Sequence, residues 1–246
     1  MEKIKISKMK RNTIFVILSL FACVLHAQET SEQELRWDYP VKPGRAEWAD
    51  FKTGLQRFDA CQIPQSVLAD LNTKDLALIC FNYPLYIEYT FSNNERRWIS
   101  DIIEEFSGLN ELSKRRDGVR ELVYLYQSLP VFDENRKISD KTSYPLIFKI
   151  AFVELLLADE SFVKQMDEQM ADELANIIVN KYEETLAHIH AYGVWSIQKT
   201  FLLGAVVVEK QGKSSGQLET LRRFIENYRN PEASLMTEMS QIISGL

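Results

Sequence analysis

The sequence predicts an all-α protein, a single domain of about nine to eleven helices packed as an irregular multi-helical bundle or as an α-solenoid-like array. Apolar residues recur at spacings of three and four along most of the chain, as they do on one face of a helix. Prolines and glycines stand where these apolar runs begin and end. The most β-branched run, at 201–210, has no second run with which it could pair as a strand.

Residues 1–27 are interpreted as a cleaved secretory signal peptide. Five basic side chains lie within the first 11 residues, and the apolar run that follows them has about 15 residues, the length of a signal-peptide core. A membrane-spanning helix needs about 20 such residues. In an alternative interpretation, the "LFAC" stretch is a lipoprotein box and Cys23 carries a lipid anchor. Both interpretations predict export to the periplasm or the extracellular medium, with no integral membrane segment after cleavage.

The charge balance disfavours nucleic acid and anionic membranes as partners. The chain has 29 basic and 35 acidic residues, of which residues 1–27 hold five and one, so 24 and 34 remain and the mature net charge is −10. Phosphate backbones are bound by clustered Lys and Arg. The two basic clusters, "NERRW" at 94–98 and "SKRRDG" at 113–118, are interpreted as solvated helix faces rather than anion sites.

The helical domain is expected to span 46–246, after an extended N-terminal arm at 28–45 in which two prolines disfavour helix. Asn72 is suited to cap a helix, with Asp75 three residues later. One early helix is predicted by four apolar residues that share a face: Trp48, Phe51, Leu55 and Phe58.

The later part of the chain contains the most apolar helices. The run from Tyr144 to Asp159 is apolar on nearly every side, so it should be the most buried helix. Residues 201–210 should form another buried helix, in which Gly204 permits a close helix crossing. Four prolines are expected to start helices and three glycines to end them: Pro64, Pro84, Pro145 and Pro231, and Gly108, Gly118 and Gly212.

Cys61 and Cys80 are expected to form a disulfide. Residues 64–71 and 73–82 are interpreted as a helical hairpin, in which the start of the first helix lies beside the end of the second. The two Cα atoms could then fall within the roughly 4.4 to 6.8 Å that a disulfide needs, and an oxidising compartment permits the bond. The alternative is two buried free thiols that act as small hydrophobic side chains, and a catalytic thiol is the least expected.

Common catalytic motifs are absent from the chain, and no cofactor is expected. The sequence contains no G-x-S-x-G, H-E-x-x-H, Walker-type glycine loop or C-x-x-C. Glu184 and His188 share a helix face, whereas His190 points about 160° away from His188. These three residues form a metal-site hypothesis only if the helix ends between the histidines. The alternative places His188 at the margin of a buried stripe and His190 near solvent.

A cluster of aromatic, amide and guanidinium side chains lies at 83–98. Flat rings beside such donors are typical of grooves that bind carbohydrate or peptide. In the alternative interpretation, the tyrosines are core residues whose hydroxyl groups reach the surface. The candidate groove residues are Tyr83, Tyr86, Tyr89, Asn93, Asn94, Arg97 and Trp98.

Three short motifs give the chain a likeness to known proteins. The stretches "YPVKPGRAEW", "ACQIP" and "CFNYPL" resemble a family of uncharacterised secreted proteins of Bacteroidetes, over about the N-terminal third of the mature chain. The resemblance implies an extracytoplasmic setting in a Gram-negative envelope. It supplies no activity and no catalytic residues.

We therefore expect an exported helical binding or scaffold module of the cell envelope, with an envelope protein as its partner. One alternative is an envelope hydrolase that acts on glycan or peptide through paired carboxylates. A second alternative is a metal-binding protein that uses Glu184 and His188. Enzymatic activity is less expected than binding because the sequence shows no catalytic motif.

Overall fold

The computed structural model describes residues 37–131, 144–212 and 216–246. The predicted signal peptide, the lipid anchor at Cys23 and the first part of the N-terminal arm lie outside these residues. The described residues belong to one compact unit, 37–246. Within them, no helix combines the length and the apolar character that a membrane crossing requires.

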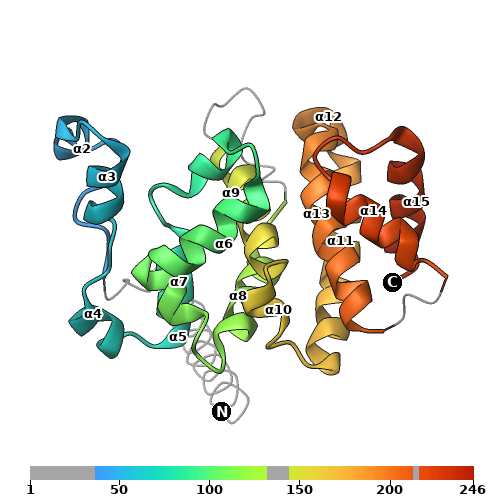
Figure 1. Ribbon diagram of the computed structural model, residues 1–246, viewed down its shortest axis with the longest axis horizontal. Helices are drawn as coiled ribbons and strands as arrows, with labels where there is room; N and C mark the ends of the chain where they lie inside the picture. Colours follow the sequence, from blue (N-terminus) through green and yellow to red (C-terminus); the bar gives the residue numbers. More distant parts are fainter. Residues whose placement is uncertain (1–36, 132–143, 213–215) are drawn as a thin grey trace, which may run out of the picture. The chain divides into compact units, whose positions relative to one another are not determined.

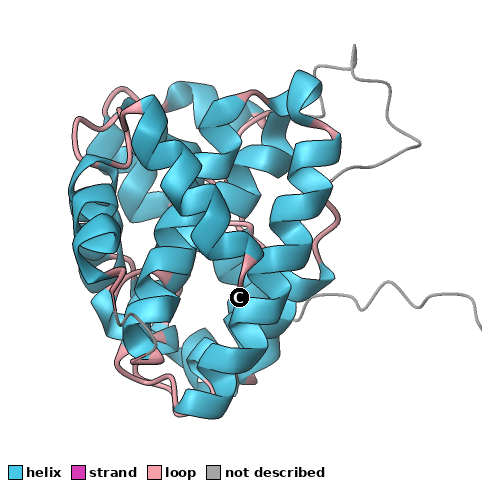
Figure 2. Ribbon diagram, turned by 90° about the vertical axis from the view of Figure 1, so that its right-hand side faces the viewer, coloured by secondary structure: helices cyan, strands magenta, loops and turns pink. Residues whose placement is uncertain are grey.

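The described secondary structure is entirely helical, as predicted, and its helices are joined by loops and turns (Figure 2). Nine of the described α-helices have seven residues or more, and the others are shorter. In chain order the helices are α2 (Ala46–Asp50), α3 (Gly54–Ala60), α4 (Gln65–Asp70), α5 (Thr73–Phe81), the 3₁₀ helix η2 (Tyr86–Phe91), α6 (Glu95–Glu105), α7 (Ser107–Leu112), α8 (Gly118–Ser128), α9 (Tyr144–Leu157), α10 (Glu160–Val163), α11 (Glu168–Ala187), α12 (Ile189–Tyr192), α13 (Val194–Lys210), α14 (Leu218–Asn227) and α15 (Ala233–Ser244).

The single early helix that we predicted is wrong, because the chain forms two short helices there. Helix α2 ends at Asp50 and α3 begins at Gly54. Thr53 Oγ1 accepts a hydrogen bond from the Gln56 backbone N–H at 3.2 Å, and the Gln56 side chain accepts one from the Thr53 N–H at 3.2 Å. This capping box starts a new helix, and Leu55 on it is 68% exposed instead of buried.

Helices α4 and α5 follow each other as predicted, and Asn72 caps α5. Asn72 Oδ1 accepts a hydrogen bond from the Asp75 N–H at 2.7 Å, and Asn72 Nδ2 donates to Asp75 Oδ2 at 2.8 Å. The cap satisfies one backbone donor that the first turn of a helix leaves without an intrahelical partner.

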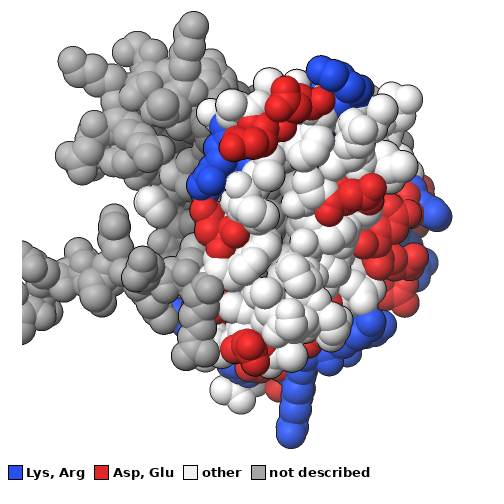
Figure 3. Space-filling model, turned by 90° about the vertical axis from the view of Figure 1, so that its left-hand side faces the viewer, with Lys and Arg blue, Asp and Glu red and all other residues white. Residues whose placement is uncertain are grey.

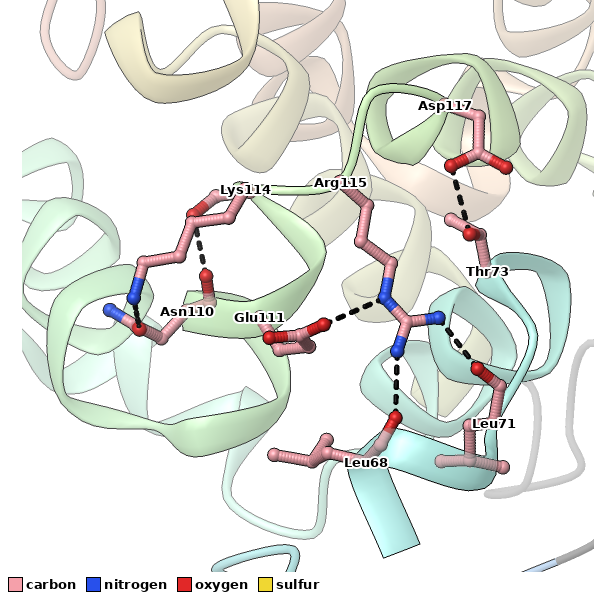
Figure 4. A network of polar contacts seen from close by, with 9 residues as sticks. Leu68, Leu71, Thr73, Asn110, Glu111, Lys114, Arg115 and Asp117 are labelled. Atoms are coloured by element: carbon pink, nitrogen blue, oxygen red, sulfur yellow. Dashed lines mark hydrogen bonds and ion pairs between the residues drawn. The ribbon is translucent and has the colours of Figure 1, made fainter. Parts of the chain in front are cut away.

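In the basic cluster at 113–118, Lys114 and Arg116 are exposed as expected, but Arg115 points inward (Figure 4). Its Nη2 and Nη1 donate to the carbonyl groups of Leu68 and Leu71, each at 2.7 Å. Its Nε contacts the Glu111 carboxylate at 2.9 Å. The last carbonyls of a helix have no intrahelical partner, so the guanidinium closes the end of α4 and attaches it to α7.

Helices α9 and α13 carry the core of the C-terminal half. Nearly all side chains of α9 from Ile147 onward are buried, as predicted. Helix α13 contacts α9, α11, α14 and α15 (Figure 1). A Cβ on Gly204 would lie 2.2 Å from Ile243 Cδ1 of α15, so a larger residue at this crossing would force the Ile243 side chain to shift. In a solenoid each repeat contacts only its neighbours, whereas α13 also contacts helices distant in sequence, as in an irregular bundle.

The prolines that we expected to start helices do so, but two of the three glycines that we expected to end helices do not. All four prolines stand within two residues of a helix start, and Gly212 follows α13 with φ +66°, as predicted. The prediction is wrong for Gly108 and Gly118, which lie in the first turns of α7 and α8. A Cβ on Gly118 would lie 2.1 Å from the Leu112 carbonyl oxygen. These glycines allow close packing and do not end a helix.

Candidate functional site

Both cysteines in the described residues are free and buried, so the disulfide that we predicted is absent from this structure. Cys61 is the C-terminal cap of α3, four residues before α4 begins, whereas the prediction placed it directly before the first helix of a hairpin. Burial raises the pKa of the Cys61 thiol to about 12, and it also raises the pKa of Cys80. A protonated thiol is a poor nucleophile, so the two cysteines act as small hydrophobic side chains.

The three candidate metal ligands are not brought together. Helix α11 ends at Ala187, where half-buried His188 caps it, and exposed His190 lies on α12. The Glu184 carboxylate accepts a hydrogen bond from the Val131 N–H at 3.1 Å. Among the residues that the structure describes, no three His, Cys, Asp or Glu side chains are grouped as a metal ion requires.

The tyrosines of the predicted groove lie in the core. Tyr83 is fully buried and its ring stacks on Phe106 at 4.4 Å between centroids. Tyr89 is also fully buried, and its hydroxyl donates to the Phe148 carbonyl at 3.1 Å. Tyr86 is half-buried. The structure therefore agrees with the core placement of the alternative interpretation, but the hydroxyl groups of Tyr83 and Tyr89 are buried and do not reach the surface.

The other predicted groove residues line two different hollows. Asn93, Asn94 and Arg97 border a polar hollow of about 590 Å³ beside the end of α14. Asn94 also caps α6, since its Oδ1 accepts from the Arg97 N–H at 3.0 Å. Trp98 borders a separate cleft of about 480 Å³. The predicted groove is thus split between the core, the polar hollow and this cleft.

We call the second hollow the aromatic cleft and define it by five of its lining residues: Trp48, Arg57, Glu88, Phe91 and Trp98. Helices α2 and α3 supply the first two side chains, η2 the next two and α6 the last. Phe91 is 82% exposed at this cleft. Sequence reasoning missed most of this site, because the cleft exists only where the α2 and α3 helices pack beside η2.

The aromatic cleft contains two charged groups, the Arg57 guanidinium and the Glu88 carboxyl group. The Arg57 guanidinium carbon lies 5.9 Å from the centroid of the Trp48 ring. The buried Nε of Arg57 has no hydrogen-bond partner in the described part of the chain. Burial raises the pKa of the Glu88 carboxyl, and the positive charge of Arg57 opposes that rise. The cleft therefore offers flat rings, a hydrogen-bond donor from Arg57 and one carboxyl group.

A buried charge pair lies beside the N-terminus of α6. The Lys199 ammonium contacts Glu95 Oε2 at 3.1 Å, with side chains 1% and 3% exposed. The Tyr228 hydroxyl donates to the same oxygen at 2.9 Å, and the Lys199 Nζ lies 4.7 Å from the centroid of the Trp195 ring. Sequence reasoning missed this pair, since Glu95 and Lys199 are far apart in the chain.

A second buried carboxyl group, Glu154, lies on α9. Its Oε1 accepts hydrogen bonds from the Tyr126 and Thr200 hydroxyls, each at 2.8 Å. Burial raises its pKa to about 7, against the opposite effect of these two hydrogen bonds and of Lys199 and Lys181. A raised carboxyl pKa is what a general acid needs, but Glu154 is enclosed within the helix core.

Comparison with models of protein families, with curated proteins and with solved structures found no match for this chain.

Proposed function

We propose that the protein is an exported binding module of the cell envelope and that its aromatic cleft receives a segment of a partner protein. One observation carries the proposal: three aromatic side chains line the same cleft as Arg57, whose buried Nε lacks a partner among the described residues. A buried donor without an acceptor costs about 1–3 kcal/mol. A ligand acceptor recovers that free energy once the Arg57 side chain turns toward the cleft, because the Nε atom itself is shielded from solvent in this structure.

The apolar exposure beside the cleft favours a protein over a glycan. Phe91, which lines the cleft, is 82% exposed. Trp, Tyr, Phe and Arg are enriched at protein interfaces and carry much of their binding energy. Figure 3 views the side of α2, α3 and α4, where much of the visible surface carries no charged side chain.

The chemistry of the cleft defines the segment that fits it. An apolar or aromatic side chain would lie among Trp48, Phe91 and Trp98. A carboxylate or backbone carbonyl beside that side chain would accept the Arg57 N–H. Glu88 disfavours a highly acidic segment, because a second buried negative charge would lie beside it. The ligand is therefore an extended apolar segment with a single acceptor facing Arg57.

Site-specific cross-linking tests the proposal. A photoreactive benzoylphenylalanine in place of Phe91 should capture one envelope protein, and the same group in place of Tyr124, an exposed aromatic residue of α8, should not. Arg57→Gln should abolish the capture, whereas Arg222→Gln on exposed α14 surface should leave it unchanged. A synthetic peptide from the captured region should then bind the purified chain with the same dependence on Arg57.

Two results would overturn the proposal. Equal capture from positions 91 and 124 would show that the cleft does not select the partner. Saturable binding of purified envelope glycan that is lost in Trp98→Ala, with no protein captured, would assign the cleft to carbohydrate. Cleavage of that glycan would support the hydrolase alternative.

A further inference from the structure

A third hollow, which we call the Lys199 pocket, lies apart from the aromatic cleft and has a volume of about 210 Å³. Ligand sites for drug-sized molecules have about 300–1,000 Å³, so this pocket suits a molecule of only a few heavy atoms. Its polar and aromatic lining comes from η2, α6, α9, α13 and the segment after α14. The lining residues used below are Glu95, Phe148, Trp195, Lys199 and Arg229.

The pocket has an excess of positive charge. Lys199 and Arg229 both line it, and Glu95 is the carboxylate that lines it with them. Glu95 Oε2 already accepts from Lys199 at 3.1 Å and from the Tyr228 hydroxyl at 2.9 Å. The positive charge of Arg229 also acts on this point, since it helps to lower the pKa of Lys199, which burial lowers most. Within the lining, one carboxylate therefore faces two cations, and the Glu154 carboxyl group outside the lining also acts on Lys199.

The Arg229 guanidinium keeps donors for a ligand. A guanidinium has five N–H groups, and Arg229 Nη1 donates to the Asn93 carbonyl. The Gln198 side chain donates to the Arg229 carbonyl at 3.5 Å, which ties this segment to α13. Arg229 itself is exposed, so its remaining donors can be reached from solvent.

Lys199 lines the pocket, and two aromatic rings lie close to its ammonium. It is buried, and its Nζ lies 4.7 Å from the Trp195 ring centroid and 5.5 Å from that of Tyr228. A buried ammonium is costly unless its charge is balanced. The rings and Glu95 balance it in part, and the approach of Arg229 works against them.

We propose that the Lys199 pocket binds a small monocarboxylate, whose carboxylate lies between Arg229 and Lys199 and whose apolar part packs on Trp195 and Phe148. Arginine and carboxylate form charge-assisted, frequently bidentate hydrogen bonds. A single negative charge balances the two cations and the one carboxylate of the lining, whereas a dianion would be repelled by Glu95 and by nearby Glu154. The volume limits the ligand to a short aliphatic or oxo acid. The proposal does not depend on the function of the aromatic cleft.

Calorimetric titration of the mature chain with propionate tests the proposal, and propionamide, which has the same shape and no charge, is the control ligand. Propionate should bind and raise the melting temperature, propionamide should do neither, and added sodium chloride should weaken binding. Arg229→Gln should weaken propionate binding about tenfold or more, because a charge-assisted pair is lost. Arg222→Gln, an equally exposed change, should have no effect.

Trp195 supplies a readout that is specific to this pocket. The chain has four tryptophans, and propionate should change the fluorescence of the wild type but not of Trp195→Phe. Three results would each overturn the proposal: propionamide binding as tightly as propionate, Arg229→Gln binding as tightly as the wild type, or inorganic phosphate binding more tightly than propionate. Since Arg229 is exposed, its replacement tests the pocket without disturbing the core.

Discussion

Glu154 should make the folded state less stable as pH rises. Its pKa is raised from 4.5 to about 7 in the folded chain, chiefly by burial. Between these two values the folded protein holds a proton that the unfolded chain releases, so the free energy of unfolding falls as pH rises through this window. Each pKa unit corresponds to about 1.4 kcal/mol, so the whole loss is about 3 kcal/mol. Above pH 7 the loss is complete.

Glu154→Gln removes this titration and keeps most of the contacts. The amide oxygen can still accept the hydrogen bonds that Tyr126 and Thr200 donate at 2.8 Å. The new amide N–H groups need acceptors that a buried carboxylate did not, which costs about 1–3 kcal/mol. We therefore expect the variant to be less stable than the wild type at pH 5 and to approach or exceed it at pH 8.

Urea denaturation at pH 5, 6, 7 and 8, followed by circular dichroism, measures both curves. The difference in unfolding free energy between wild type and variant should change by about 2.5 kcal/mol across this range. Glu104→Gln, an exposed carboxylate of α6, provides the control and should follow the wild type at each pH. Parallel curves for wild type and Glu154→Gln would refute the reasoning, because they would show that Glu154 does not keep its proton in the folded state.

Three further predictions concern stability and reactivity. A thiol reagent should label neither cysteine of the native mature chain and both after unfolding, because both are buried with raised pKa values; rapid labelling of the native chain would contradict this. Arg115→Ala should lower the free energy of unfolding by about 2–4 kcal/mol, since two carbonyl groups of the α4 end lose a charged donor, while exposed Arg116→Ala should change it little. Gly204→Ala should cost about 1–3 kcal/mol from overpacking, and Ile243→Val in the same chain should recover part of it; an unchanged melting temperature for Gly204→Ala alone would show that α15 moves freely.

The sequence was informative where the structure depends on neighbours along the chain. Asn72 and Asp75 could be recognised because a helix cap involves residues three positions apart. The buried helix α9 could be recognised because a helix that is apolar on every side is stable only inside the protein. The same reasoning failed at Thr53, whose local capping box overrode the apolar spacing from Trp48 to Phe58.

The functional surfaces could not be predicted because they depend on contacts between distant segments. The predicted groove at 83–98 assumed that its aromatic residues face one way, but Tyr83 and Tyr89 point into the core and Trp98 borders the aromatic cleft. The sequence alone predicts a solvated Arg115, because it does not show that the fold brings the end of α4 against this side chain. No local pattern marks such partners, since the pairing is set by packing.

The polar groups on α13 show why buried charge can persist in an apolar bundle. Lys199 and Thr200 are adjacent, so their side chains point about 100° apart on the helix. Lys199 pairs with Glu95 of α6, and Thr200 donates to Glu154 of α9. Replacing a buried ion pair with apolar residues is often neutral or stabilising, whereas removing one partner costs about 3–5 kcal/mol. Stability alone therefore does not explain these groups. They restrict which helices can pack against α13, because any other neighbour would leave a buried charge unpaired, and they place the Lys199 ammonium in the wall of a pocket that it shares with Arg229.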